Sequence, residues 1–92
     1  MRLEVKAIEF EFKGEIKQVR FDFLRCLQKY ASKAVSEVET EYEELKLKFK
    51  FKEPISLNTI NNSLSLFMES NSIKIDEIEY DPHEKKVEVE VK

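Results

Sequence analysis

The segment Glu37–Lys52, which reads EVETEYEELKLKFKFK, decides the fold. Its first half alternates glutamate with uncharged residues, and its second half alternates lysine with apolar residues. If the chain turns at Glu43-Glu44 and runs back antiparallel, every glutamate before the turn faces a lysine. The expected pairs are Glu41 with Lys46, Glu39 with Lys48, Glu37 with Lys50, Tyr42 with Leu45, Thr40 with Leu47, and Val38 with Phe49. Such cross-strand pairs contribute roughly 0.2–1 kcal/mol each, so the pattern predicts a β-hairpin.

A helix that continues to Glu39 is the competing interpretation of the same stretch. It would make the match of glutamate to lysine a coincidence, so the hairpin is favoured. The turn is the weak point of the hairpin, because Glu43-Glu44 lacks the residues that favour positive φ. A four-residue loop over Tyr42–Leu45 would keep the same register.

The residues before this hairpin predict a strand and a helix. Residues 3–12 alternate apolar and polar side chains but change phase after Ala7, which predicts a strand with a bulge or a switch of face. Gly14 marks a turn. Apolar residues then recur at helical spacing and predict a helix from Glu15 to Ser32, with the stripe Ile16, Val19, Phe23, Leu24, Leu27, Tyr30, Ala31 and Ala34.

The residues after the hairpin predict a second helix and a second hairpin. Pro54 is expected to end the strand, Ser56 can cap a helix, and residues 57–70 carry a helical apolar stripe. Residues 73–92 predict two strands, the first with another change of phase, joined by a turn over Asp81–Glu84.

The element order is therefore strand, helix, strand, strand, helix, strand, strand. This order predicts an α+β two-layer sandwich in which a mostly antiparallel sheet carries both helices on one face, in a ferredoxin-like or KH-like arrangement. A chain of 92 residues with 41% hydrophobic content is expected to form one domain over residues 1–92.

Composition excludes several classes of protein. No apolar run approaches the roughly 20 residues that span a bilayer, and no secretory signal is visible. A single cysteine allows neither an internal disulfide nor a cysteine metal cage, so a cytoplasmic location is expected. The 38% charged fraction, rich in lysine and glutamate, resembles that of thermophile proteins.

No residue pattern predicts an active site, a metal or a cofactor. His83 is the only histidine and sits among turn residues, and Cys26 lies at the edge of a helical apolar stripe. The single glycine excludes a glycine-rich phosphate loop. We therefore expect a protein that is not an enzyme.

A row of alternate lysines, Lys46, Lys48, Lys50 and Lys52, is the best candidate for contact with nucleic acid, because ammonium groups along a strand can follow phosphates. The opposing interpretation is a solvent-exposed strand whose lysines pair with glutamates and discourage edge pairing. The net charge of −3 favours the second interpretation.

The second helix gives a sharper signal, because Pro54–Met68 contains no charged residue although 38% of the chain is charged. Interface cores are depleted in charge. On a helical projection Leu66 points away from the apolar stripe, and Phe21 is displaced in the same way on the first helix. If both helices share one face, they form a partner-binding surface, with candidate residues Phe21, Leu57, Asn58, Ile60, Asn61, Asn62, Leu64, Ser65, Leu66 and Phe67. The opposing interpretation is a poorly patterned helix with singly exposed apolar residues.

Residues Leu3–Met68 resemble the small Pcc/CTAG-family subunit of the KEOPS complex. The resemblance rests on the strand Ile8–Phe12, the charged hairpin, and the helix that begins Ser56-Leu57-Asn58. It implies a subunit without catalytic activity that dimerises, docks its helices on the threonylcarbamoyl-transferring enzyme and supports tRNA modification. By the resemblance, the docking residues are Leu57, Ile60, Asn61, Leu64 and Phe67.

Two other classes stay open. Residues 73–91 resemble the closing hairpin of Alba-type nucleic-acid-binding proteins, which would require one long helix over residues 15–39. A stand-alone ferredoxin-like domain for protein interaction or ligand sensing is the third class. We expect an assembly or adaptor subunit that binds a protein partner through its helices.

Overall fold

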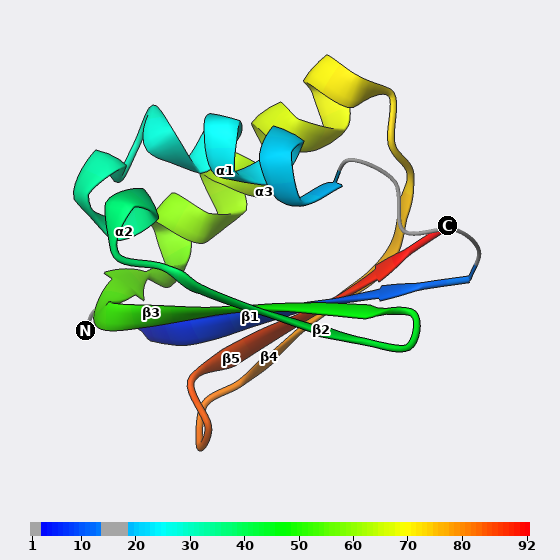
Figure 1. Cartoon of the computed structure of the whole chain (residues 1–92). Helices are drawn as coiled ribbons and strands as arrows, with labels where there is room; N and C mark the ends of the chain where they lie inside the picture. Colours follow the sequence, from blue (N-terminus) through cyan, green and yellow to red (C-terminus); the bar gives the residue numbers. More distant parts are fainter. Residues whose placement is uncertain (1–2, 14–18) are drawn as a thin grey trace.

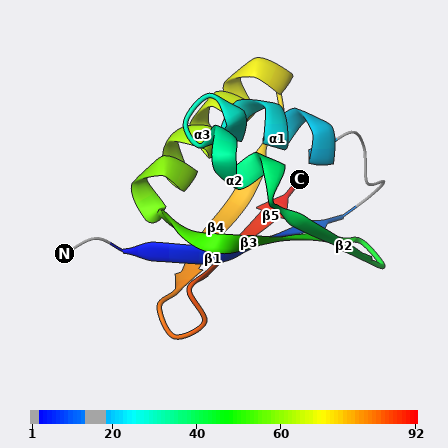
Figure 2. The ribbon, with the colours of Figure 1, turned by 60° about the vertical axis from the view of Figure 1, so that its left-hand side comes forward.

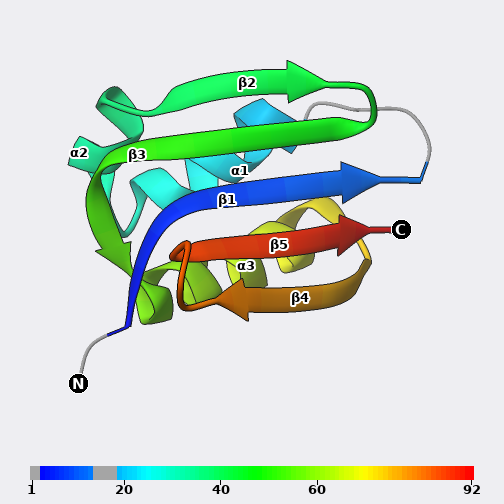
Figure 3. The same cartoon turned by 90° about the horizontal axis from the view of Figure 1, so that it is seen from below.

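The computed structural model describes residues 3–13 and 19–92 and shows a mixed sheet covered by helices on one face (Figure 1, Figure 2). The predicted α+β class, with the helices together on one face, is confirmed. The opposite face of the sheet carries no helix among the described residues (Figure 3). The elements are β1 (Glu4–Phe12), α1 (Val19–Gln28), α2 (Ser32–Ser36), β2 (Glu39–Glu43), β3 (Lys46–Ser56), α3 (Leu57–Asn71), β4 (Ile75–Asp81) and β5 (Lys86–Val91).

The sheet order is β2-β3-β1-β5-β4 (Figure 3). Neighbouring strands are antiparallel except β1 and β5, which run parallel, with Ile8 opposite Val87 and Phe10 opposite Val89. If β5 is left out, the strand order is β2-β3-β1-β4, which is the order of a ferredoxin-like sheet. The additional strand therefore lies inside the sheet, between β1 and β4.

The mid-chain hairpin of β2 and β3 is confirmed, but its predicted register is wrong by two residues. Glu43 faces Lys46, Glu41 faces Lys48 and Glu39 faces Lys50. The turn comprises Glu44 and Leu45, and Leu45 adopts a φ of 59°. A shift of two residues keeps every side chain on its face and every glutamate opposite a lysine, so the charge pattern alone could not separate the two registers.

The region between β1 and β2 contains a break that the sequence pattern did not show. The expected turn at Gly14 and the helix start at Glu15 lie outside the described residues. The predicted helix to Ser32 ends at Gln28, and the short helix α2 follows. Ala31 separates them with φ −151° and ψ 66°, and its N–H donates to the carbonyl oxygen of Leu27 at 2.8 Å.

Strand β3 continues through Pro54, which was expected to end it. The ladder between β1 and β3 shifts between Val5 and Ala7, and Pro54 lies where the ladder is interrupted. The proline has no N–H to donate and is tolerated at this irregularity. The burial of two successive residues of β1, Ala7 and Ile8, confirms the change of phase predicted within residues 3–12.

The C-terminal elements follow the prediction. The side chain of Ser56 accepts a hydrogen bond of 3.2 Å from the N–H of Thr59 and caps α3. Asp81 accepts hydrogen bonds from the N–H groups of His83 and Glu84 and so shapes the turn between β4 and β5. A register shift between Ile75 and Glu77 confirms the second change of phase.

The core lies between the sheet and the helices and centres on four phenylalanines. The ring centroid of Phe10 on β1 lies 5.1 Å from that of Phe23 on α1, 6.0 Å from that of Phe49 on β3 and 6.1 Å from that of Phe67 on α3. Edge-to-face packing of this kind stabilises each pair by about 0.5–1.5 kcal/mol beyond burial. The cluster holds α1 and α3 in place over the sheet. No helix among the described residues is long and apolar enough to cross a membrane.

Candidate functional site

The outer surface of α3 is a stripe of uncharged polar residues. Asn58, Asn61, Asn62 and Ser65 recur at helical spacing, and all are exposed. We call these four residues the amide face. It lies on the side of α3 away from the buried residues Ile60, Leu64 and Phe67. The outer surface of α3 therefore presents amides and a hydroxyl to solvent.

The burial of several predicted docking residues corrects the expected surface. Ile60, Leu64 and Phe67 are almost completely buried, because their side chains fill the space over the sheet. Leu57 and Leu66 are half-buried and pack against the core. The outward direction predicted for Leu66 is thus only partly correct, and these five side chains support α3 from within.

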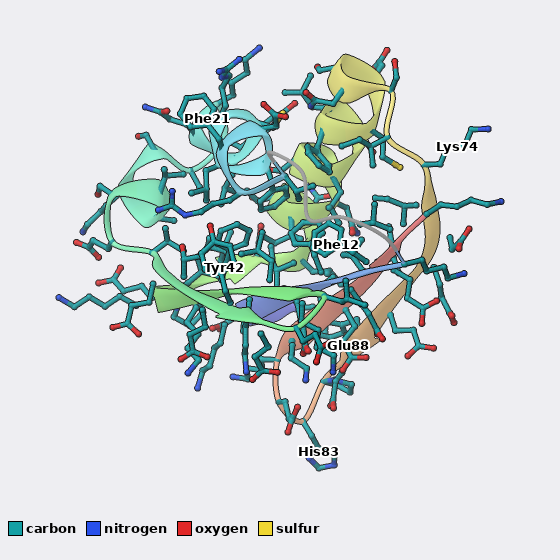
Figure 4. All side chains as sticks on the ribbon, turned by 45° about the vertical axis from the view of Figure 1, so that its right-hand side comes forward. Phe12, Phe21, Tyr42, Lys74, His83 and Glu88 are labelled. Atoms are coloured by element: carbon teal, nitrogen blue, oxygen red, sulfur yellow. The ribbon has the colours of Figure 1, made fainter. Side chains whose placement is uncertain are left out.

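Phe21 on α1 is exposed, as predicted. Its side chain is 60% exposed and points away from the rest of the molecule (Figure 4). The guanidinium carbon of Arg25, one helical turn later, lies 4.7 Å from the centroid of the Phe21 ring. Since α1 contacts α3, Phe21 and the amide face belong to one helical layer.

The lysine row on β3 lies among carboxylates. Lys50 Nζ donates to Glu41 Oε1 at 2.7 Å, and Lys46 Nζ lies 3.6 Å from Glu9 Oε1. Lys48 lies directly opposite Glu41 on the neighbouring strand β2 and directly opposite Glu9 on the other neighbour, β1. The hydrogen bond to Glu41 raises the pKa of Lys50, and the same bond lowers the pKa of Glu41. These lysines therefore face acidic neighbours, and Lys52 is exposed beyond the end of β2.

The helix-free face of the sheet carries an acidic cluster that the sequence analysis missed. Two rows cross β1, β5 and β4 in register, one of Glu9, Glu88 and Glu79 and the other of Glu11, Glu90 and Glu77. We call these six residues the acidic face. Figure 4 shows Glu88 on this side of the sheet, whereas Phe12 lies between the sheet and the helices. The alternation of glutamates was visible in each strand, but their convergence depends on β5 lying beside β1.

Lys86 is the main cation within the acidic face. Its Nζ lies 3.2 Å from Glu9, 3.1 Å from Glu88 and 3.4 Å from Glu84, and its side chain is only 16% exposed. The hydrogen bonds to Glu88 and Glu9 outweigh partial burial and raise the pKa of Lys86. Partial burial acts to raise the pKa of Glu9, but the contacts with Lys86 and Lys46 outweigh it and lower this pKa.

The outer part of the acidic face consists of Glu11, Glu77, Glu79 and Glu90, and it lacks such close ion pairs among the described residues. Among the residues that the structure describes, no lysine or arginine nitrogen lies within 4.0 Å of a carboxylate oxygen of Glu11, Glu77, Glu79 or Glu90. A hydrogen bond with Glu79 and the charges of Glu79 and Glu90 raise the pKa of Glu77. The neighbouring carboxylates therefore disfavour ionisation of Glu77.

A shallow cavity of about 190 Å³ lies on the acidic face, lined mainly by its glutamates together with Lys46 and Lys86. Sites for small molecules usually measure roughly 300–1,000 Å³. The cavity on the acidic face is smaller than this range. Within residues 3–13 and 19–92, no group of three or more histidine, cysteine or acidic residues is arranged to hold a metal ion.

Cys26 and His83 lie in different environments. Cys26 is buried in α1, and burial raises the pKa of its thiol, which opposes formation of a reactive thiolate. His83 is exposed at the tip of the hairpin of β4 and β5 (Figure 4).

Comparisons of the chain with protein-family models, with curated proteins and with solved structures found no match.

Proposed function

We propose that this protein is an adaptor subunit without catalytic activity that binds a protein partner through α1 and α3. The supporting observation is the amide face, an uncharged stripe in a chain of which 38% is charged. Phe21 adds an exposed aromatic side chain in the same helical layer. Interface cores are depleted in charge and enriched in aromatic residues.

The proposal includes the setting suggested by the resemblance to the KEOPS subunit. In that setting the partner is the threonylcarbamoyl-transferring enzyme, the protein is cytoplasmic and dimeric, and the chemistry on tRNA belongs to the partner. The raised pKa of the buried Cys26 thiol opposes its use as a nucleophile. The glutamates around Lys46, Lys48 and Lys50 weaken any attraction for phosphate, so nucleic-acid binding is not part of the proposal.

The experiment compares the binding of partners by the full chain and by surface variants. Proteins that co-purify with the tagged protein from its source cells are identified by mass spectrometry, and the affinity of each purified partner is measured by calorimetry. The threonylcarbamoyl-transferring enzyme is tested first. Phe21→Ser and the double variant Asn58→Lys/Asn62→Lys are each expected to weaken binding at least about tenfold, as removal of an interface hot spot does.

Two matched controls test the location of the surface. Tyr42 has the same 60% exposure as Phe21 but lies on β2, so Tyr42→Ser should leave the affinity unchanged. Ser32→Lys/Ser36→Lys adds two positive charges one turn apart on the exposed surface of α2. This variant should also leave the affinity for the partner unchanged. Equal effects of test and control variants, or no partner that responds to Phe21→Ser, would contradict the proposal. Sedimentation of the isolated protein tests the dimer.

A further inference from the structure

Strand β4 forms one edge of the sheet, and β5 is its only neighbouring strand among the described residues (Figure 3). A strand with one neighbour directs alternate N–H and C=O groups away from the sheet, where another extended chain can pair with them. The opposite edge is β2, which offers the same backbone groups.

The charges on the two edges differ. On the β2 edge Glu39, Glu41 and Glu43 each face a lysine of β3. On the β4 edge Glu77 faces Glu90, and Glu79 faces Glu88. Opposite charges across strands stabilise a sheet, whereas like charges directly opposite destabilise it. Among the described residues, Glu77 and Glu79 of the β4 edge therefore carry negative charge that no facing cation neutralises.

The other side of β4 is apolar. Ile78 faces Val89, which is buried under the helices, yet Ile78 is 41% exposed. Because successive residues of a strand face opposite sides of the sheet, Glu77 and Glu79 lie on the acidic face and Ile78 lies on the helix side. A chain added along β4 would thus meet carboxylates at alternate positions and an apolar side chain between them.

We propose that the β4 edge binds an extended segment of a partner protein that carries lysine or arginine at alternate positions and an apolar residue between them. The added segment pairs with the backbone of β4, places its basic side chains beside Glu77 and Glu79, and covers Ile78. A second copy of this chain is a poor occupant, because pairing β4 with itself would bring these glutamates together. This proposal uses a different surface from the helical one, so each can fail without the other.

The test uses a fluorescein-labelled seven-residue peptide that alternates lysine with valine, and fluorescence anisotropy with the full chain. Binding is expected to weaken as salt rises. The double variant Glu77→Gln/Glu79→Gln should weaken binding about threefold or more, the effect of losing exposed ion pairs. Glu39→Gln/Glu43→Gln is the matched control on the β2 edge and should bind like the original protein.

Further measurements separate strand pairing from general charge attraction. A peptide of the same sequence with N-methyl groups on alternate amides keeps its charge but loses donors, so it should bind much more weakly. Amide chemical shifts should change in β4 and β5 and stay constant in β2. Glu77→Gln/Glu79→Gln should also unfold at the same or a higher temperature, because it removes like charges, so weaker binding by this variant cannot come from unfolding.

Several results would overturn the proposal. The two double variants could lose affinity for the peptide equally, or the N-methylated peptide could bind as tightly as the original peptide. A glutamate–valine peptide could bind as tightly as the lysine–valine peptide, or the changes in amide chemical shift could centre on β2. Self-association of the protein through β4 would identify a second copy as the occupant and would equally refute the basic segment.

Discussion

The hydroxyl group of Tyr80 on β4 donates a hydrogen bond of 2.7 Å to the main-chain carbonyl oxygen of Glu4 on β1. In the sheet these two strands flank β5. The bond therefore fastens the edge strand of the C-terminal hairpin to the first strand of the chain and links residues far apart in the sequence.

Removal of this hydroxyl should weaken the attachment of β4. Tyr80→Phe is expected to lower the free energy of unfolding by about 1 kcal/mol, the usual net contribution of one hydrogen bond. Unfolding in urea, followed by circular dichroism, measures the change. Tyr42→Phe is the control, since the Tyr42 hydroxyl makes no hydrogen bond within the described part of the chain, and its stability should be unchanged. Equal stabilities for the Tyr80→Phe variant and the original protein would show that the bond contributes nothing.

Core and surface phenylalanines should respond very differently to truncation. Phe10→Ala removes the ring that contacts Phe23, Phe49 and Phe67 and should cost about 3–5 kcal/mol. This cost is a large part of the roughly 5–15 kcal/mol that stabilises a typical domain. Phe21→Ala should cost less than about 1 kcal/mol, because it loses only an exposed contact with Arg25. Similar losses for both variants, measured by thermal unfolding, would contradict this description of the core.

The Lys86 cluster should make stability depend on pH. Lys86→Met is expected to lower the free energy of unfolding by about 1–3 kcal/mol at neutral pH, since it removes the ion pairs that this side chain, which is only 16% exposed, makes with Glu9 and Glu88. The folded-state pKa of Glu9 lies below 4.5, so its contribution is present above pH 4.5 and is lost as the pH falls through that lowered pKa. The folded-state pKa of Lys86 lies above 10.5, so its contribution is present below pH 10.5 and is lost as the pH rises through that raised pKa.

Urea unfolding of the Lys86→Met variant across this range of pH measures both effects. The difference from the original protein should be largest near neutral pH and should shrink in acid. Lys92→Met is the control, because the Lys92 side chain is 67% exposed and lies 3.9 Å from Asp76. A difference that does not vary with pH would show that Lys86 acts through packing alone.

Cys26 should react slowly in the folded protein. Burial raises the pKa of its thiol and blocks the approach of reagents, so labelling by a thiol reagent at neutral pH should be many times slower than in denaturant. Cys26→Ser should retain the binding of any partner. Rapid labelling of the native protein would show that α1 opens readily or that the thiol is activated.

Sequence patterning predicted the elements whose side chains alternate or recur with a clear period. It identified both hairpins, α3 and the interruptions in β1 and β4, because burial on one face determines which residues alternate. It did not determine the register of β2 against β3, since a shift of two residues leaves the pattern of faces and charges intact. It also missed the break at Ala31, where neither glycine nor proline marks the end of α1.

The candidate surfaces depended on tertiary contacts to different degrees. The exposure of Phe21 and the uncharged surface of α3 could be predicted from helical spacing within single segments. The acidic face could not, because its glutamates come from β1, β4 and β5, and their meeting depends on the order of strands. The burial of Ile60, Leu64 and Phe67 likewise follows from the packing of α3 over the sheet.

The position of β5 also constrains how the protein folds. Ile8 and Val87 are neighbours in the sheet although most of the chain separates them, and such distant pairings slow folding because a long loop must close first. During synthesis, β1 would leave the ribosome long before its parallel neighbour β5. Until β5 is made, the edge of β1 that pairs with β5 would stay unpaired. Deletion of residues 86–91 would separate β4 from the other strands, whereas loss of an edge strand would only narrow the sheet.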